Sequence, residues 1–145
     1  MDELDRKLIG ALRGDGRKSN VELARELGVS EGTVRTRLAR LRADGTLRIL
    51  AVTDHRKLGL VVPVLFSIQT EVGKAETVAE RLTKFEELEL VELVTGNYDV
   101  VAVGFYRSND ELAEFLSKKL WKVVGIRKID TAHVLRIVKL GGRLS

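Results

Sequence analysis

The stretch SNVELARELGVSEGTVRTRLARLRA, residues 19–43, decides the fold of the N-terminal part of the chain. It reads as two short helices joined by a tight turn. Ser19 and Glu22 have the spacing of a capping box, so the first helix should begin there. Gly28 should end it, because glycine accepts the positive φ that follows many helices. Ser30 then has the short polar side chain that caps a second helix.

The second helix combines a buried stripe with a polar face. Val34, Leu38 and Leu41 recur at the helical period and should be buried. The same period turns the other positions outward, where glycine allows close approach, hydroxyls can bond base edges and arginines can bind guanine or phosphate. An ordinary helical hairpin with solvated arginines is the alternative, since this pattern also occurs in other proteins. The predicted DNA contacts on this helix are Ser30, Gly32, Thr33, Arg35, Thr36 and Arg40.

Further elements should flank this helix-turn-helix. Asp2 can cap an earlier helix whose inner face would be formed by Leu4, Leu8, Ile9 and Leu12. Residues 47–53 (LRILAVT) are apolar and β-branched, which predicts a strand resembling the wing of a winged helix. Arg48 would then contact a phosphate, although a solvated arginine is an equal alternative. We therefore expect a DNA-binding domain over residues 1–53.

The pattern changes after a polar linker at residues 54–60. The elements predicted there are a strand at 61–70, a helix at 74–85, strands at 88–95 and 98–106 joined by Gly96-Asn97, a helix opened by Ser108 and Glu111, and a strand at 126–138. The order βαββαβ is that of a ferredoxin-like unit. The sequence thus predicts an α+β protein, with a winged helix-turn-helix domain followed by a ferredoxin-like domain at 61–145.

Charge and composition narrow the class of protein. Residues 1–60 contain 13 Lys and Arg against 9 Asp and Glu, whereas residues 61–145 contain 12 against 12, so the excess positive charge lies with the helix-turn-helix. The chain has no cysteine, which excludes disulfides and thiolate metal sites. Its start is acidic and no apolar run approaches the ~18 residues of a membrane span. We expect a soluble, cytoplasmic protein.

The two strands predicted at the centre of the sheet suggest self-association. Val61–Phe66 and Val100–Phe105 are apolar at nearly every position. In a ferredoxin-like unit both helices cover one face of the sheet, and a wet opposite face would give alternating polar residues. We therefore expect a second copy to cover that face, making at least a dimer. The alternative is that the DNA-binding unit folds back over it.

The two halves together resemble the Lrp/AsnC feast-or-famine transcription regulators. The similarity covers nearly the whole chain and is strongest in LDRKLIGALRGDGR (residues 4–17), in the helices at 19–41 and in TGNYD (residues 95–99). It implies a sequence-specific DNA-binding regulator that forms dimers through its C-terminal sheets, often assembled into octamers. It also implies an effector, commonly an amino acid, bound near the hairpin glycine.

The effector residues carried over from this resemblance are few. By motif they are Gly96, Tyr98 and Asp99, with Thr131 in the last strand as a weaker match. A glycine permits close backbone approach and an aspartate can bind an α-ammonium group. The alternative is that Gly96 is simply the turn and its neighbours are the flanks of that turn.

Two other functions stay open at this stage. Some sirohaem decarboxylases resemble the same family, but they would need histidines around a tetrapyrrole and this chain has only His55 and His133. Since no catalytic constellation or metal-ligand spacing is present, we predict no enzyme activity, no metal and no cofactor. A chromatin-like architectural protein is the other alternative, because base contacts and phosphate contacts use the same residue types.

Overall fold

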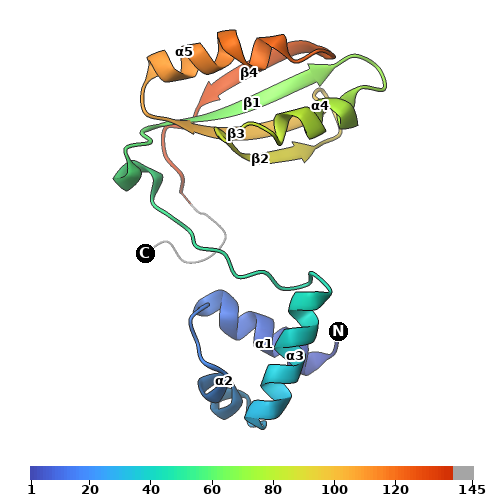
Figure 1. Ribbon diagram of the computed structural model, residues 1–145, viewed down its shortest axis with the longest axis vertical. Coiled ribbons are helices and arrows are strands. Elements are labelled where there is room, and N and C mark those ends of the chain that lie inside the picture. The colour runs from blue at the N-terminus through green and yellow to red at the C-terminus, as the bar shows by residue number, and fades with distance from the viewer. Residues whose placement is uncertain (139–145) are drawn as a thin grey trace. The chain divides into compact units, whose positions relative to one another are not determined.

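The computed structural model describes residues 1–138, which form two compact units, Met1–Val52 and Thr53–Ile137. The first is a bundle of three helices, and the second is a four-stranded sheet with two helices on one of its faces (Figure 1). Residues 139–145, the end of the predicted second domain, lie outside the described residues. No helix within residues 1–138 is long and apolar enough to cross a membrane.

The helical unit follows its local sequence signals closely. Its helices are α1 (Glu3–Gly14), α2 (Asn20–Leu27) and α3 (Glu31–Ala43). Each starts at the predicted cap, where the side chain of Asp2, Ser19 or Ser30 accepts a hydrogen bond from the backbone N–H three residues later. Gly28 ends α2 with a φ of 66°, as expected for a left-handed helix end.

The core of the helical unit is entirely aliphatic. Burial of each such side chain contributes about 1.5–3 kcal/mol, so this small core is the main source of stability for the unit. The predicted stripe of α3 is confirmed. The core residues are Leu8, Leu12, Leu23, Ala24, Val34, Leu38, Leu41 and Leu47.

The predicted wing is wrong. Residues 47–53 form no strand, although Leu47 is buried and its N–H donates to the Leu41 carbonyl at 2.8 Å. The described residues of this unit contain no strand with which the segment could pair, and an unpaired strand is unstable in water. Arg48 therefore lies exposed on irregular chain.

The sheet unit has the predicted βαββαβ order. Its strands are aligned β2-β3-β1-β4, and each neighbouring pair is antiparallel. This confirms the ferredoxin-like domain. The elements are β1 (Val62–Thr70), α4 (Ala75–Leu82), β2 (Leu88–Leu93), β3 (Val100–Tyr106), α5 (Asn109–Lys118) and β4 (Ile126–His133), with 3₁₀ turns η1 (His55–Leu58) and η2 (Leu120–Lys122).

The two central strands, β1 and β3, have one face covered by helices and one face without helices. Along β1 and β3, fully buried positions alternate with half-buried ones. The buried set packs against α4 and α5, which both cover this face (Figure 1). The half-buried set lies on the opposite, helix-free face, which we call the open face, and it includes Leu65, Val101, Val103 and Phe105.

The last strand is shorter than predicted. β4 ends at His133 rather than at residue 138. The last inter-strand bond near this end runs from the Val134 N–H to the Pro63 carbonyl at 2.9 Å. Since β1 itself begins at Val62, residues beyond 134 have no partner strand there.

The connection between β2 and β3 is longer than a two-residue hairpin. Regular pairing stops at Leu93 and Val100, so residues 94–99 form the loop. Asp99 is drawn toward the neighbouring strand: its N–H donates to the Ile68 carbonyl at 2.9 Å. Its carboxylate accepts bonds from the N–H and hydroxyl of Thr70 at 2.7 and 3.1 Å. One further backbone bond, from the Val94 N–H to the Asp99 carbonyl at 2.9 Å, continues the β2–β3 connection, and the bonds to β1 hold Asp99 on its other side.

The segment predicted as a polar linker, 54–60, instead packs on the sheet unit. The His55 ring stacks on Phe105 with centroids 3.7 Å apart and planes 12° apart, and it also contacts the Glu89 carboxylate. Gly59 ends the turn η1 with a φ of 79°. The ring of Phe105, half-buried on the open face, packs against the histidine, and the polar composition of the segment alone did not predict this contact.

Candidate nucleic-acid interface and effector region

The outer face of α3 is the candidate DNA-binding surface. Because Val34, Leu38 and Leu41 point into the core, the opposite side of the helix is exposed. Gly32, Arg35 and Thr36 lie on this side and are exposed. No ion pair within residues 1–138 engages Arg35, so its guanidinium can donate to a base or phosphate.

Two of the predicted contacts are engaged in capping α3. The Ser30 hydroxyl accepts from the Thr33 N–H at 3.1 Å and lies 2.8 Å from the Thr33 hydroxyl. These bonds fix the start of the helix. Such a helix start carries partial positive charge and exposed N–H groups, which suit a DNA phosphate.

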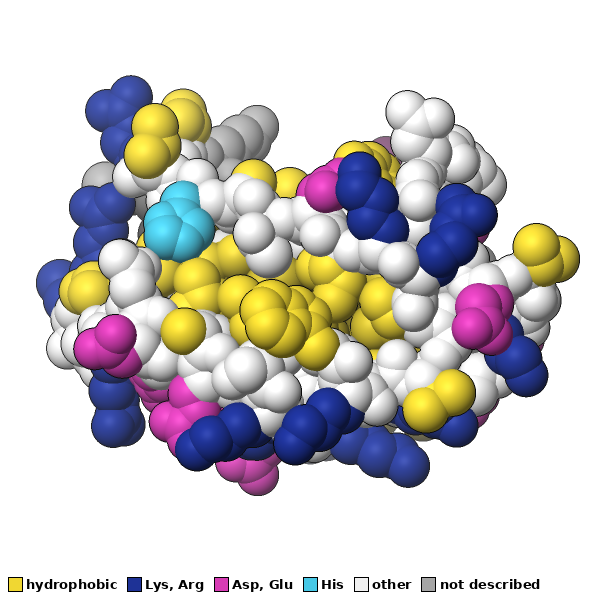
Figure 2. Space-filling view, turned by 90° about the horizontal axis from the view of Figure 1, so that it is seen from above, with side chains coloured by type: hydrophobic (Ala, Val, Ile, Leu, Met, Phe, Trp, Pro, Cys, Tyr) yellow, Lys and Arg dark blue, Asp and Glu magenta, His cyan; other side chains and the backbone are white. Residues whose placement is uncertain are grey.

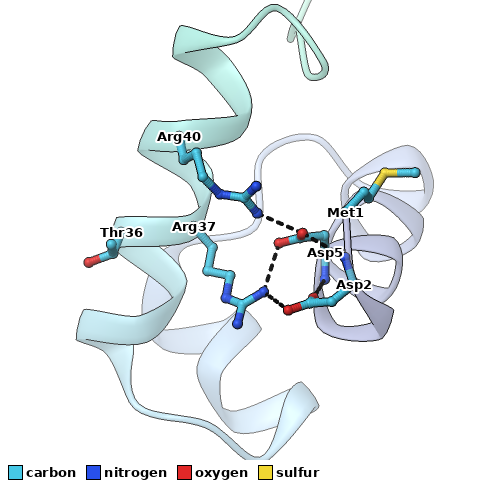
Figure 3. A pocket seen from close by; sticks show the side chains of 6 residues that line it. All are labelled: Met1, Asp2, Asp5, Thr36, Arg37 and Arg40. Atoms are coloured by element: carbon cyan, nitrogen blue, oxygen red, sulfur yellow. Dashed lines mark hydrogen bonds and ion pairs between the residues drawn. The ribbon is translucent and has the colours of Figure 1, made fainter.

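The structure adds a cluster that the sequence reading did not find. Asp2, the N-cap of α1, and Asp5, in its first turn, bind two arginines of α3 (Figure 3). The Arg40 guanidinium lies 2.6 Å from Asp5, and Arg37 lies 3.1 Å from Asp5 and also pairs with Asp2. Arg40 is thus a predicted DNA contact that already has a partner, and Arg37 was not predicted at all. No short-range motif could have found pairs more than thirty residues apart.

Electrostatics make this cluster permanent near neutral pH. The Asp5 side chain is only 1% exposed, and its hydrogen bond to Arg40 holds the pKa of that carboxyl far below its usual range. The hydrogen bond from Arg37 likewise lowers the pKa of Asp2. Both carboxylates therefore stay charged wherever DNA binding would be measured.

A second polar network joins the 94–99 loop to the ends of β1 and β4. Besides the bonds of Asp99 to Thr70, the Gln69 side chain donates to the Asn97 carbonyl at 2.7 Å and accepts from Arg127 at 3.0 Å. Gly96 has a φ of 117°, which only glycine adopts without strain. The predicted effector residues Gly96, Tyr98 and Asp99 therefore share one loop.

Tyr98 points to a residue that was not predicted. Its hydroxyl donates to the Asp130 carboxylate at 2.6 Å, and this bond raises the pKa of Tyr98. The ammonium of Lys128 lies 2.8 Å from the same carboxylate and lowers its pKa. Thr131 pairs in register with the core residue Phe66 and so lies on the other face of β4 from Asp130. The structure does not bring Thr131 to the network.

The two histidines lie on opposite faces of the sheet. His55 stacks on Phe105 of the open face, whereas His133 pairs in register with Val64, whose side chain points to the helices. Within one copy of the chain, the sheet therefore separates the two imidazoles. Within residues 1–138, no three His, Cys, Asp or Glu side chains gather as a metal site.

Comparison with known proteins agrees with this architecture. Residues 1–42 match the AsnC-type helix-turn-helix domain, and residues 64–144 match the Lrp/AsnC ligand binding domain. The chain belongs to the Lrp/AsnC family. It is 36% identical over 148 residues to the HTH-type transcriptional regulator Ptr1 of Methanocaldococcus jannaschii, covering 99% of this chain and 98% of Ptr1. It is 34% identical over 142 residues to an HTH-type transcriptional regulator of Pyrococcus furiosus, covering 97% and 96% of the two chains.

Solved structures of Lrp/AsnC proteins have the same fold. AsnC of E. coli matches with a TM-score of 0.85 and 25% identity over 97% of this chain and 95% of AsnC. A Neisseria meningitidis regulator, solved in complex with L-Met, matches with a TM-score of 0.86 and 22% identity over 97% and 93% of the chains. The protein is thus a transcriptional regulator with a DNA-binding unit and a ligand-binding unit.

Proposed function

We propose that this regulator recognises specific DNA sequences by placing α3 in the major groove. The observation that carries the proposal is the exposed side of α3, where Gly32, Arg35 and Thr36 lie opposite the buried stripe. Glycine allows close approach to the DNA, Arg35 can bond guanine, and the Thr36 hydroxyl can bond a base or phosphate. Arg48 lies beyond the helix and would contact a phosphate only.

A second copy of the chain is the proposed partner. The open face carries apolar, half-buried residues such as Leu65, Val101 and Val103, and a soluble monomer rarely leaves such a surface uncovered. Figure 2, the view from above, shows hydrophobic side chains gathered in the middle of that side of the molecule, with lysines and arginines near the rim. A dimer would present two copies of α3 to half-sites about 34–36 Å apart, or a multiple of that distance.

The 94–99 loop is the proposed effector region. An amino acid has an ammonium and a carboxylate, and this network offers the Asp99 carboxylate and the backbone around Gly96. The N. meningitidis regulator of the same fold was solved with L-Met, which favours an amino acid as the effector class. The effector would act by binding one state of the assembly more tightly than another.

The DNA proposal is tested by fluorescence anisotropy on the DNA upstream of the protein's own gene and on a scrambled duplex, each over a salt series. We expect tighter binding to the native segment with a steep salt slope. Arg35→Ala should weaken that binding by about 1–3 kcal/mol and reduce the preference for the native segment. Arg13→Ala, an exposed arginine of α1, controls for loss of charge. Equal binding of both duplexes would instead favour a chromatin-like protein.

The dimer is tested by light scattering coupled to size exclusion. Val103→Lys places a charge on the open face and should shift the protein toward monomer. Val72→Lys is the matched control, because Val72 is fully exposed outside the sheet. An assembly that survives Val103→Lys unchanged would place the interface elsewhere.

A further inference from the structure

Helix α3 has more arginines than are free to contact DNA. Arg35, Arg37, Arg40 and Arg42 all lie on α3. Asp2 and Asp5 bind Arg37 and Arg40, whereas no ion pair within the described residues engages the other two. In Figure 3 the bound pair extends toward the first turn of α1, and the Thr36 side chain points away from it. Half of the arginines of α3 are therefore held by carboxylates of another helix.

The carboxylates themselves are fixed in place. Asp2 and Asp5 form a reciprocal capping box, in which each side chain accepts the other residue's backbone N–H at 3.0 Å. The positive end of α1 stabilises both negative charges. Because Asp5 is buried, withdrawal of Arg40 would remove the shorter of its two ion pairs and leave the buried charge with Arg37 alone, at 3.1 Å, which is unfavourable. A solvated DNA phosphate is thus a poor competitor for Arg40.

We propose that Asp2 and Asp5 are specificity-determining residues, which hold Arg37 and Arg40 and so prevent α3 from binding phosphates of any sequence. The proposal rests on the DNA-binding function proposed above. Binding without sequence preference grows with the number of phosphates that lysines and arginines neutralise. Two held arginines reduce that number, and discrimination then depends on the unpaired face around Arg35 and Thr36. Selectivity is then gained by weakening the complexes with DNA of unrelated sequence.

The low pKa of Asp5 agrees with this role. The carboxylate remains ionised throughout the neutral range, so the clamp of Asp2, Asp5, Arg37 and Arg40 is constant and does not switch with pH. Each aspartate bonds a single nitrogen of a given arginine, which leaves the other guanidinium N–H groups able to reach DNA when an aspartate is removed.

The test compares three substitutions that each remove one negative charge from the N-cap or the first turn of α1. Asp2→Asn removes one of the two carboxylate partners of Arg37 and keeps a good N-cap. Asp5→Asn removes the partner of Arg40 and the other partner of Arg37. Glu3→Gln is the matched control, because the Glu3 side chain is 80% exposed and, among residues 1–138, forms an ion pair only with Lys7 of its own helix. Any affinity tag belongs at the C-terminal end, so that α1 is unaltered.

Binding of the full chain to the scrambled duplex is measured by anisotropy over a salt series. We expect Asp2→Asn and Asp5→Asn each to bind that duplex about tenfold more tightly than Glu3→Gln, with a salt slope steeper by about one. The ratio of affinities for the native and scrambled duplexes should fall accordingly. Adding Arg37→Gln to Asp2→Asn should return scrambled binding to the wild-type level, which a purely structural role for Asp2 would not do.

The opposite results are equally clear. If Asp2→Asn binds the scrambled duplex no more tightly than Glu3→Gln, or more weakly, the aspartates do not restrain the arginines and the proposal is overturned. If Asp5→Asn fails to fold, as circular dichroism would reveal, Asp2→Asn and the double variant decide alone. Failure of the proposed function is distinguishable, since it would appear in the wild-type protein as equal affinity for both duplexes.

Discussion

The helical unit and the sheet unit differ in how far along the chain their contacts reach. In the helical unit the core is built by three consecutive helices and by Leu47 just after them, and its side chains are aliphatic. In the sheet unit β1 pairs with strands that begin 38 and 64 residues after its own start, at Val100 and Ile126 against Val62, and Phe66, Tyr106 and Phe115 cluster over it. The first unit therefore depends on local signals and a small core, and the second on long-range pairing.

This difference predicts unequal stability. A unit of about 50 residues buries a small fraction of its surface and is marginal, whereas the larger aromatic core of the sheet unit is better able to tolerate the loss of one side chain. The predictions below test this contrast.

The largest effect is expected for Leu38→Ala in α3. Leu38 is 4% exposed, and the cavity should lower the free energy of unfolding by about 2–5 kcal/mol. The helices α1–α3 should then lose protection while the sheet unit keeps it, as measured by amide hydrogen exchange. Ala39→Ser, at the exposed neighbouring position, is the control. Equal loss of protection in both units would mean that they unfold together.

Smaller changes in the free energy of unfolding, opposite in sign in the two units, are expected when one glycine of each unit is replaced by alanine. At Gly104 in β3 a Cβ would lie 2.8 Å from the Glu87 carbonyl oxygen and 2.7 Å from the Tyr106 hydroxyl oxygen. We expect a loss of about 1–3 kcal/mol. At Gly10 in α1 no atom lies within 4 Å, so alanine should stabilise the helix by about 0.5–1 kcal/mol. Urea unfolding followed by NMR signals of each unit measures the change in the free energy of unfolding for both variants. If both variants raise or both lower it, the expected opposite effects on the two units are refuted.

The smallest expected effect is the loss of stability of the helical unit at acidic pH. Because the folded pKa of Asp5 lies below its unfolded value, its contribution to stability is complete above the unfolded pKa and is lost as pH falls toward the folded one. The helical unit should therefore keep this contribution at pH 7 and lose part of it by pH 3, which lies below the ordinary aspartate pKa of 3.8. Asp5→Asn should be less stable than wild type at pH 7, and the difference should narrow at pH 3.

Urea titrations followed by NMR signals of α1–α3 measure this change. Glu76→Gln, an exposed acid of α4, serves as the control and should leave the pH dependence of the helical unit as it is. If Asp5→Asn and wild type lose stability in parallel as the pH falls, Asp5 does not supply the acid sensitivity.

What the sequence did not predict depends on residues that lie far away along the chain. The strand expected at 47–53 had the right composition but no neighbour to pair with. The linker at 54–60 was judged by its polarity, whereas the ring of Phe105, far along the chain, attracts His55. The residues of the 94–99 loop were identified, but their partners Thr70 and Asp130 were not.

The sequence by itself determined the three helices with their caps, the buried stripe of α3, the βαββαβ order and the family. Those features depend on periodicity and on hydrogen bonds between residues three or four apart, which are visible in a short window. Only the tertiary structure decided that Asp2 and Asp5 bind Arg37 and Arg40, and that Tyr98 bonds Asp130. Each of these contacts joins side chains more than thirty residues apart, and packing of whole elements has to bring them together first.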